Sequence, residues 1–255
     1  MNINDSIAVV TGGASGLGEA VVRNIIGNRG RAAILDLNTE KGENLAEELG
    51  ENVIFIETDV TDEDSVQQAL TQTIHKFGSI NTVVNCAGLG VAKKVYGRKG
   101  VHDLQSFSKV IQVNLIGTFN VIRLAAEHMA NNKLLEKGKE GVIINTASVA
   151  AFEGQIGQAA YSASKGGIVG LTLPTARELA VHGIRVMAIA PGIFNTPMFS
   201  SLPEEAKDAL GAMTPYPSRL GEPAEYAKLA QSIIENSMLN GEVIRLDGAI
   251  RMQPK

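Results

Sequence analysis

The fold follows from one stretch near the start of the chain, Ile7-Ala8-Val9-Val10-Thr11-Gly12-Gly13-Ala14-Ser15-Gly16-Leu17-Gly18. Residues 7–10 are apolar and predict a buried strand, and residues 16–28 have the apolar period of a helix. Glycines in the turn between them allow tight turning and let the backbone approach a phosphate closely. The first turn of the helix then presents unpaired N–H groups and a partial positive charge to a pyrophosphate.

The spacing of these glycines, Gly12-x3-Gly16-x-Gly18, is not the common G-x-G-x-x-G. A plain strand–helix turn is therefore an alternative interpretation. The turn lies directly after a strand and before a helix, however, and that position favours a cofactor site.

The rest of the chain alternates between short β-branched runs and longer runs of helical period. The predicted strands are residues 7–10, 32–35, 53–56, 80–85, 142–145, 184–189 and 242–246. The predicted helices are residues 16–28, 39–49, 62–77, 106–132, 158–180 and 223–235. Apolar strands with little polar alternation are typical of a parallel sheet covered on both faces. The sequence thus predicts one α/β domain over residues 1–255, a doubly wound (Rossmann) parallel sheet of seven strands with helices on both faces.

The composition narrows the class of protein. The 255 residues carry a formal net charge of −4, which argues against a nucleic-acid binder. Cys86 is the one cysteine, so no intramolecular disulfide can form, and a reducing compartment fits. The N-terminus lacks the basic region of a secretory signal, and no apolar run reaches the ~20 residues that cross a bilayer. The four histidines lack metal-ligand spacing. We expect no metal, no nucleic-acid or membrane partner, and a cytoplasmic protein, with the mitochondrial matrix open for a eukaryotic source.

Acidic and small residues follow the next strands. Asp36 ends the second strand, where a carboxylate can accept hydrogen bonds from the adenosine ribose and would repel a 2′-phosphate. No lysine or arginine lies among residues 12–22, and Leu37 follows Asp36, so the sequence indicates NAD. Asp59 either bonds the adenine amino group or caps the next helix. Residues 85–88, Asn-Cys-Ala-Gly, leave room for a cofactor across the sheet edge.

A tyrosine and a lysine lie four residues apart in the fifth predicted helix. Tyr161 and Lys165 therefore share one helix face. A free phenol has a pKa of about 10, and a nearby ammonium group favours the phenolate and lowers that pKa. A phenol tuned in this way can act as a general acid or base. Such pairs are also common by chance, so the catalytic interpretation depends on the cofactor site beside them.

Taken together, these motifs resemble those of the short-chain dehydrogenase/reductase family. The matching residues, in order across nearly the whole chain, are Thr11-Gly12-x3-Gly16-x-Gly18, Asn85-x-Ala87-Gly88, Asn114, Ser148, Tyr161-x3-Lys165 and Pro191-Gly192. Cys86 departs from the usual Asn-Asn-Ala-Gly of the second motif.

The resemblance implies roles for four catalytic residues. Ser148 would hold the substrate oxygen, Tyr161 would move the hydroxyl proton, and Lys165 would lower the Tyr161 pKa and bond the nicotinamide ribose. Asn114 would hold a water that links Lys165 to solvent. The structural alternatives are a strand-end cap for Ser148 and a satisfied polar group in a helix for Asn114.

The resemblance also implies the binding residues. The cofactor set is Gly12, Ser15, Gly16, Leu17, Gly18, Asp36, Leu37, Asp59, Val60, Cys86, Ala87, Gly88, Tyr161, Lys165, Pro191, Gly192, Ile193 and Thr196. The substrate set is Ser148, Gln155, Gln158 and Tyr161.

Residues 142–157, 158–170 and 218–254 resemble most the family members that act on 3-hydroxyacyl-CoA thioesters. The implied reaction is the NAD-dependent interconversion of a 3-hydroxyacyl-CoA and a 3-ketoacyl-CoA. Three alternatives stay open: a hydroxysteroid or other secondary-alcohol dehydrogenase, a 3-oxoacyl-[acyl-carrier-protein] reductase, and a non-catalytic scaffold subunit. The family also implies a homotetramer, with the helices at 106–132 and 158–180 as the natural contacts.

Two long connections interrupt the alternation, residues 89–103 and 191–221. Long connections in a compact domain are usually functional or mobile. The first carries Lys93, Lys94, Arg98, Lys99 and His102, with Asp103 as its one acid. We expect these cations either to attract the phosphates of coenzyme A or to form a solvated loop. We expect the second connection, with a short helix from 203 to 212, to be a substrate lid.

Overall fold

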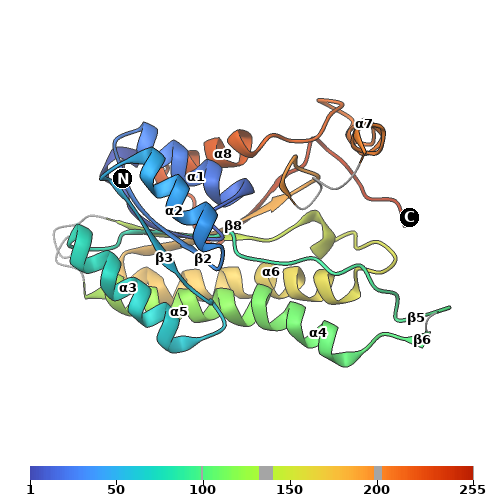
Figure 1. Cartoon of the computed structure of the whole chain (residues 1–255), viewed down its shortest axis with the longest axis horizontal. Helices are drawn as coiled ribbons and strands as arrows, with labels where there is room; N and C mark the ends of the chain where they lie inside the picture. Colours follow the sequence, from blue (N-terminus) through green and yellow to red (C-terminus); the bar gives the residue numbers. More distant parts are fainter. Residues whose placement is uncertain (99, 132–139, 198–202, 255) are drawn as a thin grey trace.

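Seven parallel strands form the centre of the molecule (Figure 1). The computed structural model describes residues 1–98, 100–131, 140–197 and 203–254. The strands are β1 (Ile7–Thr11), β2 (Arg31–Asp36), β3 (Val53–Glu57), β4 (Thr82–Asn85), β7 (Gly141–Thr146), β8 (Ile184–Pro191) and β9 (Val243–Leu246). They lie in the order β3-β2-β1-β4-β7-β8-β9, and every neighbouring pair is parallel. The doubly wound seven-stranded fold predicted from the sequence is confirmed.

Helices cover both faces of the sheet (Figure 1). One face carries α1 (Gly16–Gly27), α2 (Thr39–Leu49) and α8 (Pro223–Glu235). The other carries α3 (Glu63–Phe77), α5 (Thr118–Ala130) and α6 (Ala159–Leu179). The apolar stripes of these helices pack on strands that are buried on both sides, which is why the strand sequences show continuous apolar runs. Short helical turns occur at η1 (Ile3–Asp5), η4 (Val149–Ala151) and η5 (Ala180–His182).

The chain changes direction in the sheet between β1 and β4. After β1 it adds β2 and β3 on one side, and it then returns to place β4 on the other side of β1. The loops that leave β1 and β4 therefore separate at the carboxyl edge of the sheet. Open α/β sheets bind ligands in the crevice that opens at such a point.

The predicted helix at 106–132 is not one regular helix. It consists of α4 (Leu104–Ile111), a π-helical segment η2 (Gln112–Gly117) and α5. α4 begins two residues earlier than predicted because Asp103 is its N-cap, accepting a hydrogen bond from the Ser106 N–H at 2.7 Å. Asn114 lies in the π-helical segment and bonds the backbone of Leu89, a contact that no helical period can reveal. Residue 132 lies outside the described residues.

Both long connections leave the sheet on the carboxyl side. Residues 89–103 contain a small hairpin, β5 (Tyr96–Gly97) and β6 (Gly100–Val101), that projects away from the sheet (Figure 1). Residues 191–221 contain α7 (Glu204–Ala212), and a bridge between Phe194 and Gly221 joins the ends of this connection. Lys99 and residues 198–202, parts of the predicted insertion and lid, lie outside the described residues. Among the helices that the structure describes, none combines the length and apolar character needed to span a membrane.

Candidate active site

The glycine turn after β1 packs directly on the end of β4. Gly12 has a φ of +63°, and a Cβ there would lie 2.8 Å from the Ala87 nitrogen. The Ala87 N–H donates to Thr11 Oγ1 at 3.2 Å, and the Cys86 N–H donates to the Thr11 carbonyl. A side chain at Gly12 would push these two loops apart, so glycine is required here by space and by conformation.

Asp36 is fixed at the end of β2 by the turn itself. Its Oδ2 accepts a hydrogen bond from the Ala14 N–H at 3.1 Å, and its Oδ1 accepts one from the Asn38 N–H at 3.0 Å. The carboxylate is therefore held beside the glycine turn, while the next side chain, Leu37, is 64% exposed. This geometry suits a carboxylate that accepts hydrogen bonds from a ribose.

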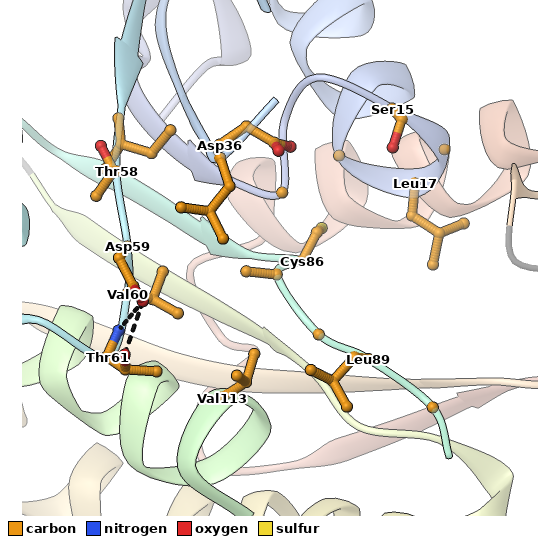
Figure 2. Close-up of a pocket in the computed structure, with 18 of the residues that line it drawn as sticks. Ser15, Leu17, Asp36, Thr58, Asp59, Val60, Thr61, Cys86, Leu89 and Val113 are labelled. Atoms are coloured by element: carbon orange, nitrogen blue, oxygen red, sulfur yellow. Dashed lines mark hydrogen bonds between the residues drawn. The ribbon is translucent and has the colours of Figure 1, made fainter. Parts of the chain in front are cut away.

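A cleft of about 830 Å³ opens between the glycine turn, the ends of β2, β3 and β4, and the α4–η2 helix (Figure 2). Thirteen of the predicted cofactor residues line it: Gly12, Ser15, Gly16, Leu17, Gly18, Asp36, Leu37, Asp59, Val60, Cys86, Ala87, Gly88 and Thr196. Pro191, Gly192, Ile193, Tyr161 and Lys165 are not among the described residues that line it. The sequence analysis missed Leu35, Thr58, Thr61, Leu89, Gly90, Lys109, Gln112, Val113 and Pro197.

The missed residues differ in how well the sequence indicates them. Thr58 and Thr61 flank Asp59 at a strand end, so the same argument from strand ends could have found them. Lys109, Gln112 and Val113 belong to the α4–η2 helix, which lines one side of the cleft. This helix is distant in sequence from the glycine turn. Only the three-dimensional structure brings that helix to the site.

Asp59 is not a helix cap. Its Oδ1 accepts hydrogen bonds from the Thr61 N–H at 2.8 Å and from Thr61 Oγ1 at 2.7 Å (Figure 2). Asp62 is the N-cap of α3, because its Oδ1 accepts the Ser65 N–H at 2.8 Å. The capping alternative for Asp59 is therefore wrong, and its carboxylate stays at the cleft wall.

Lys165 is a buried cation at the start of α6, with only 5% of its surface exposed. Its Nζ donates a hydrogen bond to the Thr146 carbonyl at the end of β7, at 2.7 Å. Burial removes water from the ammonium group and lowers the pKa of Lys165 to about 8. No carboxylate is among the groups that shift this pKa, so the charge is compensated mainly by a carbonyl dipole.

Tyr161 lies one helical turn before Lys165, and the Lys165 Nζ is 5.8 Å from the centroid of its ring. Burial raises the pKa of Tyr161, and a hydrogen bond with Ser148 offsets part of that effect. We expected Lys165 to lower this pKa. The net shift is upward instead, because desolvation outweighs the other influences and Lys165 donates its hydrogen bond to the Thr146 carbonyl.

Ser148 is a cap, as one of its two interpretations has it, and its contact with a substrate oxygen stays a prediction. Its hydroxyl reaches the Tyr161 phenol and lowers the pKa of that phenol. The same Oγ accepts a hydrogen bond from the Ala150 N–H at 3.1 Å and caps η4. The cap therefore fixes the hydroxyl beside the tyrosine.

The Asn114 amide is held by three hydrogen bonds to protein groups. Its Oδ1 accepts the Leu89 N–H at 2.8 Å, and its Nδ2 donates to the Leu89 carbonyl at 2.9 Å and to Ser164 Oγ at 3.1 Å. The side chain therefore ties the loop after β4 to α6. The water-holding role of Asn114 stays a prediction.

Gln155 and Gln158 lie on the loop that precedes α6. The Gln155 N–H donates to Gln158 Oε1 at 3.0 Å, and Gln155 Nε2 donates to the Gln253 carbonyl at 3.0 Å. The loop that carries the predicted substrate contacts is thus bound to the C-terminal end of the chain.

A cluster of polar side chains surrounds Thr146, whose carbonyl accepts the hydrogen bond from Lys165. Thr146 Oγ1 lies 2.7 Å from the hydroxyl of Tyr226, a fully buried residue of α8, and donates to the Asn85 carbonyl at 2.6 Å. Cys86 Sγ is 3.8 Å from the same Tyr226 hydroxyl, and burial raises the pKa of its thiol. These contacts fix the position of Thr146 and so of the carbonyl that Lys165 Nζ bonds. Tyr226 gave no signal in the sequence.

Comparison with known proteins agrees with this geometry. The family model described as short chain dehydrogenase matches residues 6–207. The chain belongs to the short-chain dehydrogenase family.

The chain is 59% identical over 255 residues to 3-hydroxyacyl-CoA dehydrogenase type-2 of Homo sapiens, covering 99% of this chain and 98% of that protein. The crystal structure of 3-hydroxyacyl-CoA dehydrogenase type-2 from Mycobacterium avium superposes with a TM-score of 0.94 at 45% identity, over 98% of each chain. A 3-ketoacyl-(acyl-carrier-protein) reductase from Brucella melitensis, complexed with NADH, gives a TM-score of 0.87 at 27% identity, over 98% of this chain and all of that one (100%). As a short-chain dehydrogenase the protein is an oxidoreductase, and family and neighbour together support a nicotinamide cofactor.

We expect Lys165→Met to raise the free energy of unfolding at neutral pH while abolishing activity. The folded pKa of Lys165, about 8, lies below its ordinary 10.5, so the folded state binds fewer protons than the unfolded state between these values. This difference in pKa corresponds to a destabilisation of the folded state by roughly 3 kcal/mol. The hydrogen bond to Thr146 that the variant loses contributes only ~1 kcal/mol, so the net effect of the substitution is stabilising. The gain is fully present below about pH 8 and falls as the pH rises toward 10.5.

Urea unfolding across this pH range measures the effect. Lys228→Met, which removes an exposed lysine of α8, is the control and should change stability little at any pH. A Lys165→Met variant no more stable than the wild type at neutral pH would show that the buried Lys165 charge does not destabilise the folded state.

Proposed function

We propose that this short-chain dehydrogenase interconverts 3-hydroxyacyl-CoA and 3-ketoacyl-CoA thioesters with NAD as its cofactor. The main support is the similarity to 3-hydroxyacyl-CoA dehydrogenases type-2 over almost the full length of both chains. The chain retains Asn114, Ser148, Tyr161 and Lys165, and the last three meet beside the cleft.

The residues account for the proton in this reaction. A nicotinamide cofactor, when bound, accepts the hydride from the carbon that bears the hydroxyl and returns it in reduction. Tyr161 Oη takes the hydroxyl proton in oxidation and gives it back in reduction. Ser148 Oγ holds the substrate oxygen as its charge changes. Neutral pH lies below the Lys165 pKa of about 8, so the amine is mostly protonated. Its positive charge favours the Tyr161 phenolate when the two groups approach.

The cleft favours NAD over NADP. Asp36 is held as a carboxylate acceptor at the ribose end, and a 2′-phosphate there would meet like charge. Among the described lining residues Lys109 is the one cation, and it comes from α4, not from the glycine turn or the residues that follow Asp36.

The alternatives differ in what they require. The NADH-bound reductase neighbour acts on acyl-carrier-protein substrates by its name, so that activity is the closest competitor, together with hydroxysteroid oxidation. A non-catalytic scaffold would have no need of a Ser148 hydroxyl bonded to Tyr161 with a buried Lys165 one helical turn away. A steady-state screen of acetoacetyl-CoA, longer ketoacyl-CoAs, an acyl-carrier-protein thioester and steroids separates these possibilities.

We also propose that residues 191–221 act as a substrate lid and that the insertion at 89–103 borders the substrate entrance. A hollow of about 560 Å³ lies between residues 94–96 of the insertion and residues 154–157 of the loop before α6. The described basic side chains of the insertion are not equivalent. Lys93 forms an ion pair with Asp103, so it is engaged within the loop, whereas Lys94 lines the hollow.

A homotetramer is the assembly we propose. Three apolar side chains on the outer surface of η2, α5 and α6 support it: Ile116 is 45% exposed, Phe119 51% and Leu173 44%. Exposed apolar groups on neighbouring helices are typical of surfaces buried between subunits.

We expect the wild type to prefer NADH over NADPH by about 100-fold in kcat/KM, and Asp36→Asn to reduce that preference at least tenfold, since it removes the charge that repels the phosphate. Asparagine keeps an oxygen that can accept the Ala14 N–H, so the glycine turn stays supported. Asp64→Asn, on the first turn of α3, is the control. Equal use of both cofactors by the wild type would refute the assignment.

We expect Tyr161→Phe to lower kcat for acetoacetyl-CoA reduction by about 10²-fold or more while NADH binding, measured by fluorescence titration, is kept. The phenol is the group that moves the proton, and phenylalanine preserves the ring. Ser232→Ala, which removes an exposed hydroxyl of α8, is the control. A Tyr161→Phe variant with more than about a tenth of the wild-type rate would assign the proton transfer elsewhere.

We expect Lys94→Ala with Arg98→Ala to raise KM for acetoacetyl-CoA several-fold at low salt. The effect should shrink at high salt, because exposed charges are screened within ~8 Å at physiological ionic strength. Lys76→Ala with Lys228→Ala, on α3 and α8, is the control pair of equal charge. An equal rise in KM for a neutral alcohol would show that the insertion shapes the pocket without attracting coenzyme A.

A further inference from the structure

The chain does not end at the last strand of the sheet. After β9, residues 247–254, called here the C-terminal tail, run between two segments that we place at the substrate site. One is the loop 152–158, which connects the Ser148 cap to the start of α6. The other is the α7 segment, residues 203–221. The tail contacts both.

Apolar side chains join the tail to the α7 segment. Ile250 is only 1% exposed and packs in one cluster with Ile193 and Leu220. Leu210 and Met213 from the α7 segment, and Met252 from the tail, pack against the same cluster. The Tyr216 N–H also donates to the Gly248 carbonyl at 3.3 Å. A shift of α7 would therefore disturb the tail.

Charged groups join both β9 and the tail to the loop: Arg245 belongs to β9, whereas Asp247, Arg251 and Met252 belong to the tail. The Glu153 carboxylate accepts both Nη groups of Arg245, at 2.8 and 3.1 Å, and the Met252 N–H at 3.3 Å. Arg251 Nε lies 3.3 Å from the same carboxylate. Asp247, only 8% exposed in its side chain, accepts Arg245 Nε at 2.7 Å. A two-point arginine–carboxylate pair that is three-quarters buried holds its geometry better than an exposed ion pair.

Backbone contacts continue this junction to the substrate residues. The Ile156 N–H donates to the Pro254 carbonyl at 3.0 Å, and Gln155 Nε2 donates to the Gln253 carbonyl at 3.0 Å. At its other end the loop continues directly from the η4 cap, because the Glu153 N–H donates to the Val149 carbonyl at 2.9 Å. The loop is thus fixed between the catalytic serine and the tail.

We infer that Glu153 is a positioning residue that couples the α7 segment, through the C-terminal tail, to the loop between Ser148 and Tyr161. When α7 becomes ordered over a substrate, the tail transmits that ordering to the loop and so to Ser148 and Tyr161. Loss of the Glu153 contacts leaves α7 and the loop free to move separately. Small misplacements of reacting groups cost large factors in rate, so such a coupling affects turnover without touching the substrate. The inference deepens the proposed function and rests on its placement of the substrate between these segments.

The test compares Glu153→Gln with Glu48→Gln. Both remove the charge of a carboxylate that pairs with an arginine through two bonds, and Glu48 pairs with Arg23 on the far surface of α1 and α2. Hydrogen exchange, measured on the full chain with NADH bound, should rise by about tenfold in both 153–158 and 204–212 for Glu153→Gln. Glu48→Gln should leave both segments unchanged. A chain ending at residue 251 keeps the ion cluster but loses the backbone contacts, and it should loosen 153–158 in the same direction.

Kinetics provide the second readout. For Glu153→Gln we expect kcat/KM for acetoacetyl-CoA to fall about tenfold, with KM for NADH changed less than about twofold. Faster exchange in 153–158 with no change in 204–212 would overturn the coupling, as would unchanged exchange in both segments of a folded variant. A similar loss of NADH binding would also overturn it, because it would indicate a general disturbance. The exchange experiment needs no substrate, so a wild type that fails to reduce acetoacetyl-CoA would refute the proposed function and leave this test in force.

Discussion

The structure depends on the close contact between two backbones at the carboxyl edge of the sheet, where Gly12 meets Ala87. This contact needs a residue with no side chain at a positive φ angle, and two hydrogen bonds from the β4 loop to Thr11 maintain it. Because the sheet changes direction between β1 and β4, the same contact forms the floor of the cleft. Asp36 is fixed in turn through Ala14, so the ribose end of the site is built on the same turn.

The catalytic end of the site follows a different physical rule. Lys165 is buried with a carbonyl in place of a carboxylate as its main partner, and the Thr146 that supplies this carbonyl is fixed by Tyr226 from the opposite face of the sheet. A buried ammonium group is unfavourable, and its low pKa is the sign of that cost. Tyr161 beside it is shifted toward its neutral form. The protonation state of Lys165 is therefore sensitive to small changes in its surroundings near neutral pH, whereas burial holds Tyr161 in its neutral form.

The sequence predicted the features that arise from periodicity and from strand ends. All seven strands and the helices on both faces follow from the apolar runs, and the glycine turn together with the resemblance to the family indicates thirteen of the residues that line the cleft. It could not predict features that depend on side chains meeting across the fold. The π-helical segment at Asn114, the support of Thr146 by Tyr226 and the junction of Glu153 with the tail all join residues distant in sequence. Lys93 shows a further limit, since a count of charges cannot reveal that one cation is already paired.

The π-helical segment also restricts how this chain can vary in length. A π-turn holds one residue more than the α-helical turn it replaces, and each residue rotates a helix by about 100°. Deleting one residue between Gln112 and Gly117 would restore a regular helix, but it would turn the apolar stripe of α5 away from the sheet and move Asn114 away from Leu89. Insertions and deletions are therefore disfavoured in the middle of this helix, while the neighbouring β5–β6 hairpin, in which Tyr96 and Val101 are exposed, tolerates changes of length better.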